Sequence, residues 1–226
     1  MERRSIAIDG PAGAGKSTLS NMLASHFGLI YVDTGAIYRS VGLHAYNKGV
    51  NSKDAEGVSL LLPNIKIEMM YDGGLQHMIL NGRDVTSDIR MPEISVYASD
   101  VSAIPSVRDF LLDMQRKMAK DYDVIMDGRD IGTVVLPNAG LKLFLSATPE
   151  DRAKRRYEEL VAKGVDTTYA DVLRDINYRD KNDSTRAASP LRPADDAMLL
   201  DTTGNSLQES LDILKRIVSD HLKRQG

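Results

Sequence analysis

Apolar residues in this chain fall into short runs separated by stretches with helical spacing. Five runs have the length and composition of buried strands: residues 5–9, 29–33, 124–127, 141–145 and 197–201. Apolar positions three or four apart predict helices at residues 16–27, 35–48, 104–119, 149–163 and 206–224. Strands that alternate with helices in this way favour an α/β fold, in which a parallel sheet has helices on both faces.

Two regions break this alternation. Residues 65–69 and 76–80 alternate between apolar and polar, which is typical of an antiparallel pair, and Asp72, Gly73 and Gly74 lie between them as a turn. Residues 165–190 are polar, and residues 150–186 contain nine acidic and nine basic side chains. Such a dense and balanced charge predicts a mobile surface lobe.

The composition narrows the class of protein. The chain has 226 residues, of which 42% are apolar, enough for one sizeable core. Its net charge of -3 offers no basic surplus of the kind that duplex binding needs. It has no cysteine and its four histidines are scattered, which argues against disulfides and zinc sites. No segment resembles a signal peptide or a membrane span, so we expect a soluble, cytoplasmic protein without nucleic-acid or membrane partners.

One glycine-rich segment follows the first predicted strand and opens the first predicted helix. It matches the pattern G-x-x-x-x-G-K-[ST], and its residues are Gly10, Pro11, Ala12, Gly13, Ala14, Gly15, Lys16 and Ser17, followed by Thr18. Glycines let successive backbone N–H groups turn inward around phosphates, and the helix N-terminus attracts negative charge. Lys16 should reach the β- and γ-phosphates and the Ser17 hydroxyl should bind Mg²⁺. The segment is therefore predicted to bind the triphosphate of a nucleotide.

A phosphate-binding loop does not identify the reaction, because GTPases, nucleic-acid motors and small-molecule kinases all use one. A GTPase would carry the guanine-reading pattern N-K-x-D, but residues 47–50 read N-K-G-V, and the pattern is absent. A motor would normally be longer and have a basic channel. A small kinase needs arginines around a second phosphate and a lid that excludes water.

Four further segments identify a resemblance. They read D-T-G-A-I-Y-R at 33–39, N-G-R-D-V-T at 81–86, D-G-R-D-I-G-T-V-V at 127–135, and R-D-x-x-D-x-x-R at 179–186 with S-P-L at 189–191. Their order and spacing resemble the bacterial cytidylate kinase family, and the resemblance covers nearly the whole chain. Two positions differ from the commonest pattern: Thr34 stands where serine is frequent, and Asn182 stands where some members have arginine.

The resemblance implies a P-loop NTPase-type parallel sheet flanked by helices, with a small antiparallel β-rich insert that binds the nucleoside monophosphate and a short helical lid. We expect a single domain over residues 1–226. Its core should comprise about 1–40, 104–164 and 190–226, the insert about 41–103 and the lid about 165–189.

Arginine suits an acceptor phosphate because its planar group donates two parallel hydrogen bonds to phosphate oxygens. Arg39 lies early in a predicted helix and Arg129 follows a buried strand, at the strand end where ligands bind in open α/β sheets. The resemblance implies that both bind the phosphate of CMP together with the Thr34 hydroxyl. The alternatives are a solvated charge for Arg39, an ion pair for Arg129 and a helix cap for Thr34.

The base pocket follows from the same resemblance. Asp130 would accept a hydrogen bond from the N4 amine of cytosine, to which a carboxylate is chemically suited, whereas uracil would present a carbonyl oxygen there. Arg108 would donate to O2 and N3 of the base, and Ser99 would complete the pocket. Without the resemblance, Arg108 and Ser99 could be ordinary surface residues.

Carboxylates and arginines near the transferred group have more than one interpretation. Asp127 ends a buried strand, where it could hold Mg²⁺ or help to place the acceptor. Arg152 and Arg156 lie four residues apart on one helix face and could reach the ATP phosphates or form surface pairs with residues such as Glu159.

The lid is expected to contribute to both substrates. Arg179, Asp183 and Arg186 recur every three or four residues on one face. The resemblance implies that Arg179 and Asp183 contact the ribose and that Arg186 contacts the phosphates. The expected catalytic groups are therefore those of Lys16, Arg129, Arg152, Arg156 and Arg186.

Together these features predict a monomeric kinase that uses Mg²⁺ and transfers the γ-phosphoryl group of ATP in line to CMP or dCMP. UMP or a small metabolite is the alternative acceptor. A nucleotide-binding regulatory or nucleic-acid-handling ATPase is the alternative class.

Overall fold

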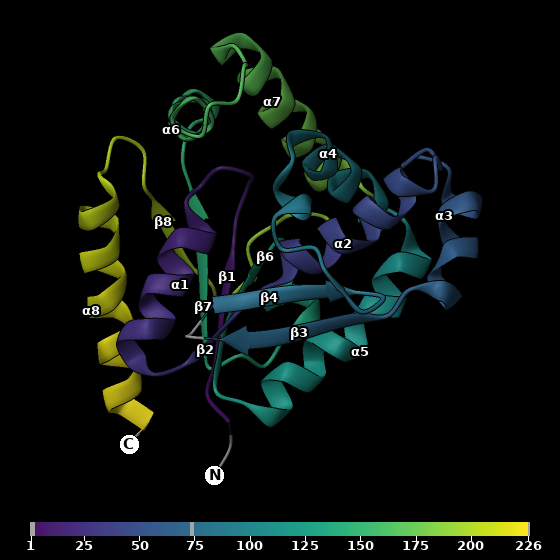
Figure 1. The fold of residues 1–226 in the computed structure, drawn as a ribbon. Helices are drawn as coiled ribbons and strands as arrows, with labels where there is room; N and C mark the ends of the chain where they lie inside the picture. The colour runs from purple at the N-terminus through teal and green to yellow at the C-terminus, as the bar shows by residue number, and fades with distance from the viewer. Residues whose placement is uncertain (1–2, 73–74, 226) are drawn as a thin grey trace.

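A five-stranded parallel sheet forms the centre of the protein (Figure 1). The computed structural model describes residues 3–72 and 75–225. The strand order is β2-β6-β1-β7-β8, and the strands are β1 (Ser5–Asp9), β2 (Ile30–Asp33), β6 (Val124–Gly128), β7 (Leu141–Ser146) and β8 (Met198–Asp201). All five predicted strands and their parallel pairing are confirmed. In register, Asp9 lies beside Gly128, and Asp33 lies beside Asp127, so these carboxyl ends meet at one edge.

Helices cover both faces of the sheet. Ile6 and Ile8 of β1 face one side and pack with the apolar stripes of α1 (Lys16–Phe27) and α8 (Leu207–Gln225). Ala7 faces the other side, where it packs in a cluster that α5 (Pro105–Asp121) and the short helical segment η3 (Ile131–Val135) help to cover. Because both faces are covered, the central strands have almost no polar residues before their ends, as in buried parallel sheets generally.

The insert has more helix than the sequence indicated. Its antiparallel sheet is confirmed and gains a short third strand, in the order β3-β4-β5. The elements are α2 (Thr34–Asn47), α3 (Ala55–Leu61), η1 (Leu62–Asn64), β3 (Ile67–Asp72), β4 (Leu75–Leu80), β5 (Arg83–Asp84), η2 (Asp88–Arg90) and α4 (Pro92–Val101). Helices α3 and α4 were not predicted, and Gly73 and Gly74 of the predicted turn lie outside the described residues. Apolar residues of α2, α4, α5 and the small sheet form a second core.

The polar region after residue 165 contains a long regular helix. Helix α7 (Tyr169–Thr185) follows α6 (Pro149–Ala162), and the two pack through a small apolar cluster formed by Ala153, Leu160, Val172 and Ile176. The lid is therefore helical, as expected, and it has a buried face. In Figure 1, α7 runs from α6 towards α4 of the insert.

Among the described residues, no helix combines the length and the apolar character that crossing a membrane requires.

Candidate functional site

The phosphate-binding loop joins β1 to α1. Gly10 has φ +150°, and a Cβ there would lie 2.0 Å from the carbonyl oxygen of Leu145, so only glycine fits. Gly15 has φ +80° and precedes α1, whose first turn receives no side-chain cap from it. The first N–H groups of α1 are therefore available to a ligand. Helix N-termini with this arrangement bind phosphate.

Lys16 lies in this loop with its ammonium group buried. Its Nζ donates to the carbonyl oxygen of Pro11 at 2.7 Å, and the residue is 5% exposed. Burial, together with the nearby Arg129 guanidinium, lowers the pKa of Lys16 well below its ordinary value. A buried cation with one carbonyl partner is poised to pair with an anion such as a phosphate oxygen.

A carboxylate lies beside the loop at the end of β6. The Ser17 hydroxyl donates to one oxygen of Asp127 at 2.8 Å, and the Tyr31 hydroxyl donates to the other at 3.1 Å. Burial and the neighbouring Asp33 raise the pKa of Asp127 to about 6. Oxygen ligands close to phosphate groups suit Mg²⁺. A divalent cation would also offset the electrostatic repulsion between the buried carboxylates of Asp127 and Asp33. Ser17 and Asp127 therefore fit the metal that the sequence predicts.

A cavity of about 990 Å³ extends from the loop to the insert and the lid. Most of the predicted site residues line it: Ala12, Gly13, Ala14, Gly15, Lys16, Ser17, Thr18, Thr34, Arg39, Ser99, Arg108, Asp127, Arg129, Asp130, Arg156, Arg179, Asp183 and Arg186. Gly10, Pro11 and Arg152 lie outside its lining. The structure thus brings residues from seven separate segments of the chain around one cavity.

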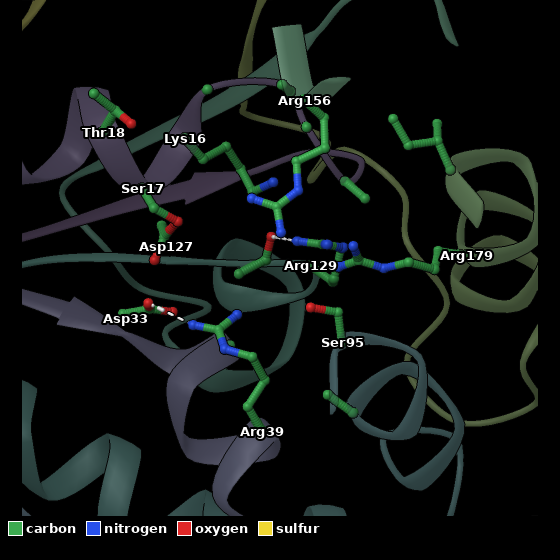
Figure 2. A pocket seen from close by; sticks show the side chains of 18 of the residues that line it. Lys16, Ser17, Thr18, Asp33, Arg39, Ser95, Asp127, Arg129, Arg156 and Arg179 are labelled. Atoms are coloured by element: carbon green, nitrogen blue, oxygen red, sulfur yellow. Dashed lines mark hydrogen bonds and ion pairs between the residues drawn. The ribbon is translucent and has the colours of Figure 1, made fainter. Parts of the chain in front are cut away.

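Arginine side chains point into this cavity from different elements (Figure 2). Arg39 of α2 pairs with Asp33 at 2.8 Å, Arg129 follows β6, and Arg179 reaches in from α7. Within the described residues, the buried Nε atoms of Arg39 and Arg179 and the Nη2 of Arg186 have no hydrogen-bond partner. Burial and the nearby Arg129 lower the pKa of Arg179 to about 10. Guanidinium groups with unused donors at such close range favour an anionic ligand.

Arg129 is held by the lid. Its Nε donates to Asp183 of α7 at 2.7 Å, and Asp183 also accepts from the Ser99 hydroxyl at 3.2 Å. Burial alone would raise the pKa of Asp183, but Arg129 and Arg179 outweigh it and hold that pKa below its ordinary value. The carboxylate is therefore charged at neutral pH, and it orients Arg129.

The candidate base pocket contains a buried ion pair. Arg108 pairs with Asp130 and also donates to the carbonyl oxygen of Ser102 at 3.1 Å. Arg186 lies 3.7 Å from the other Asp130 oxygen, and the Arg108 guanidinium lies 5.7 Å from the ring centroid of Tyr38. The pair presents a carboxylate and a guanidinium side by side, which matches the donor and acceptor edge of cytosine.

Asp9 supports the site from outside the cavity lining, and the sequence did not reveal this role. It ends β1, and its two oxygens accept from the backbone N–H groups of Ile131 and Gly132 at 2.8 and 2.7 Å. These bonds hold the backbone just after Arg129 and Asp130. Burial raises the pKa of Asp9 to about 6 despite them. A carboxylate at the end of an apolar strand was visible in the sequence, but its partners lie 122 and 123 residues away.

Some residues that line the cavity were not singled out from the sequence. Tyr38 and Ser102 flank the base pocket, and Arg90 lies 3.4 Å from Asp33 at its edge. Tyr38 belongs to the segment 33–39, whereas Ser102 and Arg90 lie outside the four segments and reach the cavity because the insert folds over the sheet.

Arg152 and Arg156 of α6 do not share one role, which differs from the expectation. Arg152 is 3% exposed, and its guanidinium donates to the carbonyl oxygens of Ala147 and Ala12 and to Asp180 of the lid. The structure therefore makes Arg152 a brace between the loop and the lid, because each of its three guanidinium nitrogens donates to the protein. Arg156 lines the cavity and pairs with Glu159 at 2.7 Å, the surface partner that was its alternative.

Comparisons with known proteins agree with this geometry. The family model for cytidylate kinase matches residues 6–220. Cytidylate kinase of Caldicellulosiruptor bescii is 52% identical over 211 residues, and that of Caldicellulosiruptor saccharolyticus is 50% identical; each match covers 93% of both chains. A solved structure of an uncharacterized protein from Eubacterium ventriosum shares the fold, with a TM-score of 0.52 at 11% identity over 96% of this chain and 99% of that one. The chain belongs to the cytidylate kinase family, a family of nucleoside monophosphate kinases.

Proposed function

We propose that this protein transfers the γ-phosphoryl group of ATP to CMP, and to dCMP, with Mg²⁺. The observation that carries the proposal is a set of three arginines, Arg39, Arg179 and Arg186, each with a buried and unused donor nitrogen, in the same cavity as the phosphate-binding loop. A loop alone would support nucleotide binding. A second group of guanidinium donors beside it supports a second phosphorylated substrate.

The donor half of the site would hold the ATP triphosphate. The N–H groups of residues 13–18 would surround the β- and γ-phosphates, and Lys16 would exchange the Pro11 carbonyl for phosphate oxygens. Ser17 and Asp127 would hold Mg²⁺, directly or through water. When bound, the metal would neutralise charge on the triphosphate.

The acceptor half would hold CMP. Arg39, Arg129 and the Thr34 hydroxyl lie at the phosphate end, next to the loop. Asp130 and Arg108 would meet the cytosine edge, and Ser99 lies between them and the lid. On the lid, Asp183 and Arg179 are the candidates for the ribose, and Arg186 contacts both Asp130 and Ser102. This order supports CMP over a short hydroxy acid or sugar, which has no base to contact the buried Arg108–Asp130 pair.

The chemistry asks little covalent work of the protein. An acceptor phosphate oxygen is already anionic at neutral pH, so the transfer needs no general base. The site residues would position the two substrates in line. Lys16, Arg129 and Arg156 would neutralise the negative charge as it spreads over the transferred group. Arg152 would act only indirectly, by holding the loop carbonyl of Ala12.

A coupled assay of ADP release tests the proposal. It would scan CMP, dCMP, UMP, AMP and small metabolites at fixed ATP and Mg²⁺. We expect CMP and dCMP to give the highest kcat/KM. ADP release that needs a non-nucleotide acceptor would contradict the proposal and favour a small-metabolite kinase. ADP release that is stimulated by nucleic acid alone would contradict it and favour a nucleic-acid-handling ATPase.

We also propose that the protein acts as a monomer in the cytoplasm, without a nucleic-acid or membrane partner. The absence of cysteine from the sequence supports a reducing compartment. Sedimentation analysis at several concentrations tests the monomer.

A further inference from the structure

A hydrogen-bonded cluster joins the lid to the insert outside the cavity. The Tyr178 hydroxyl of α7 donates to one oxygen of Asp100, at the end of α4, at 2.5 Å. The Ser52 hydroxyl, in the loop before α3, donates to the other oxygen at 2.7 Å. None of these three residues lines the cavity. The cluster therefore has no direct part in binding substrate.

The cluster has the features of a specific contact. Asp100 is 7% exposed, and each of its oxygens accepts from a hydroxyl, which offsets the cost of burying a carboxylate. The Lys53 ammonium lies 5.2 Å from the ring centroid of Tyr178. Burial and the hydrogen bond to Asp100 raise the pKa of Tyr178, so its hydroxyl remains a donor at neutral pH.

The next turn of α7 extends this contact. Asn182 lies four residues after Tyr178 and so shares its helix face. Its side-chain amide donates to both the carbonyl oxygen and the hydroxyl of Ser99, each at 2.9 Å. Ser99 directly precedes Asp100. Two consecutive residues of α4 thus hold one face of the lid helix, and Asn182, the position that differs from the common pattern, belongs to that face.

The contacts on α7 adjoin residues that face the cavity. Arg179 follows Tyr178, and Asp183 follows Asn182. Asp183 orients Arg129, as described above. By contrast, the lid contacts the loop that would bind ATP through a different residue, Asp180, which pairs with Arg152. The insert therefore determines the position of the lid residues on the acceptor side. Arg152 of α6 determines the position of the lid residue on the donor side, Asp180.

From this arrangement we infer that Ser52, Asp100, Tyr178 and Asn182 form an insert–lid latch. Its residues are positioning residues that place Arg179 and Asp183 in the acceptor half. The inference rests on the proposed function, because it assigns the acceptor half to CMP. The inference predicts different effects on the two substrates: loss of the latch weakens the binding of CMP and leaves the binding of ATP unchanged.

Two conservative substitutions test the latch by kinetics. Tyr178→Phe removes the donor, and Asp100→Asn removes the charge. We expect each to raise KM for CMP about ten-fold, the size expected when a hydrogen bond to a charged group is lost. KM for ATP should change less than about two-fold. Tyr169→Phe is the matched control, because the Tyr169 hydroxyl is on the same helix but donates to the backbone carbonyl oxygen of Glu150 in α6, at 3.4 Å. This variant should leave KM for CMP unchanged.

A distance measurement tests the latch without catalysis. Because the chain has no cysteine, Glu93→Cys in α4 and Lys181→Cys in α7 place two spin labels at exposed positions on the joined helices. The label distance should be narrowly distributed in the parent protein and in the Tyr169→Phe variant without substrate. It should broaden in Tyr178→Phe and Asp100→Asn.

The outcomes separate this inference from the proposed function. A parent protein that fails to phosphorylate CMP would overturn the proposed function, and the label distances would still report on the contact between α4 and α7. A parent protein active on CMP, with latch variants that keep its KM for CMP, would overturn the inference whatever the distances. Equal rises in KM for CMP and ATP would also overturn it, because they would indicate a general structural defect.

Discussion

The donor and acceptor halves of the cavity are built in opposite ways. The donor half comes mainly from one continuous segment, residues 10–18, whose backbone N–H groups and Lys16 face the cavity. The acceptor half takes single side chains from α2, α4, α5, the turn after β6 and α7. Under the proposed function, a local backbone shape would recognise the triphosphate, and side chains brought together from distant positions would recognise the base with its phosphate. The first depends on local sequence and the second on packing.

The same difference appears in how each half is held. The phosphate-binding loop is supported by close backbone packing of Gly10 against Leu145. It is also held by the hydrogen bond that Arg152 donates to the carbonyl oxygen of Ala12. The acceptor half is supported by ion pairs between side chains of distant segments, such as Arg129 with Asp183 and Arg108 with Asp130. Substitutions in the donor half should therefore act on turnover or on folding, and those in the acceptor half on selectivity. Four substitutions test this comparison.

Lys16→Ala should have the largest effect, because it removes the cation nearest to the transferred group. We expect kcat to fall by about 10³-fold or more, with circular dichroism and the thermal midpoint close to those of the parent protein. A variant that retains near-normal turnover would contradict the role given to the donor half.

Arg152→Ala should act mainly on folding. The change leaves Asp180 and the carbonyl oxygens of Ala147 and Ala12 without their buried partner, and we expect a loss of about 3 kcal/mol in the free energy of unfolding, measured in urea. Arg156→Ala is the control at the neighbouring turn, where the exposed pair with Glu159 contributes little to stability. Equal stability of the two variants would show that the brace is unimportant.

Asp130→Ala should alter selectivity more than turnover. Without the carboxylate, the pocket no longer prefers the N4 amine over a carbonyl, so the ratio of kcat/KM for CMP to that for UMP should fall about 30-fold. Asp130→Asn, which keeps the shape and leaves one acceptor, checks that the loss is not caused by unpairing Arg108. An unchanged CMP to UMP ratio in both variants would refute the assignment of base reading to Asp130.

Asp127→Asn should stabilise the protein in the absence of nucleotide and metal. The folded-state pKa of Asp127 is about 6 against an ordinary 3.8, so its contribution to stability is full below pH 3.8 and is lost as the pH rises through 6. The variant should therefore exceed the parent protein by about 1–2 kcal/mol at pH 8 and by much less at pH 4.5, measured by urea unfolding.

The same variant tests the metal site. Added Mg²⁺ with ATP should raise the thermal midpoint of the parent protein more than that of Asp127→Asn. A midpoint equally sensitive to Mg²⁺ in both proteins would show that Asp127 does not contribute to the metal site.

Much of the fold was predictable because its signals are local. Helix α1 begins and ends as predicted, and Gly28, which follows it with φ +66°, caps its end. Helices α3 and α4 were missed. Helix α3 has seven residues, and α4 mixes apolar residues with Ser99 and Asp100, whose side-chain partners lie on other segments. Short helices that are stabilised by tertiary packing have weak patterns of their own.

The amino-acid sequence alone determined the strands and the phosphate-binding loop, because each depends on neighbours within a few positions. The residues proposed for the acceptor phosphate and the base were found through the family resemblance. Only the tertiary structure decided which arginines are available. Arg152 and Arg156 are both arginines of the same helix. Arg152 donates its hydrogen bonds to the loop and the lid, whereas Arg156 lines the cavity. Asp9 and Asp100 likewise acquire their roles from partners at least 48 residues away. A guanidinium or carboxylate acts according to which donors and acceptors its neighbours leave unused, and that depends on packing between distant segments.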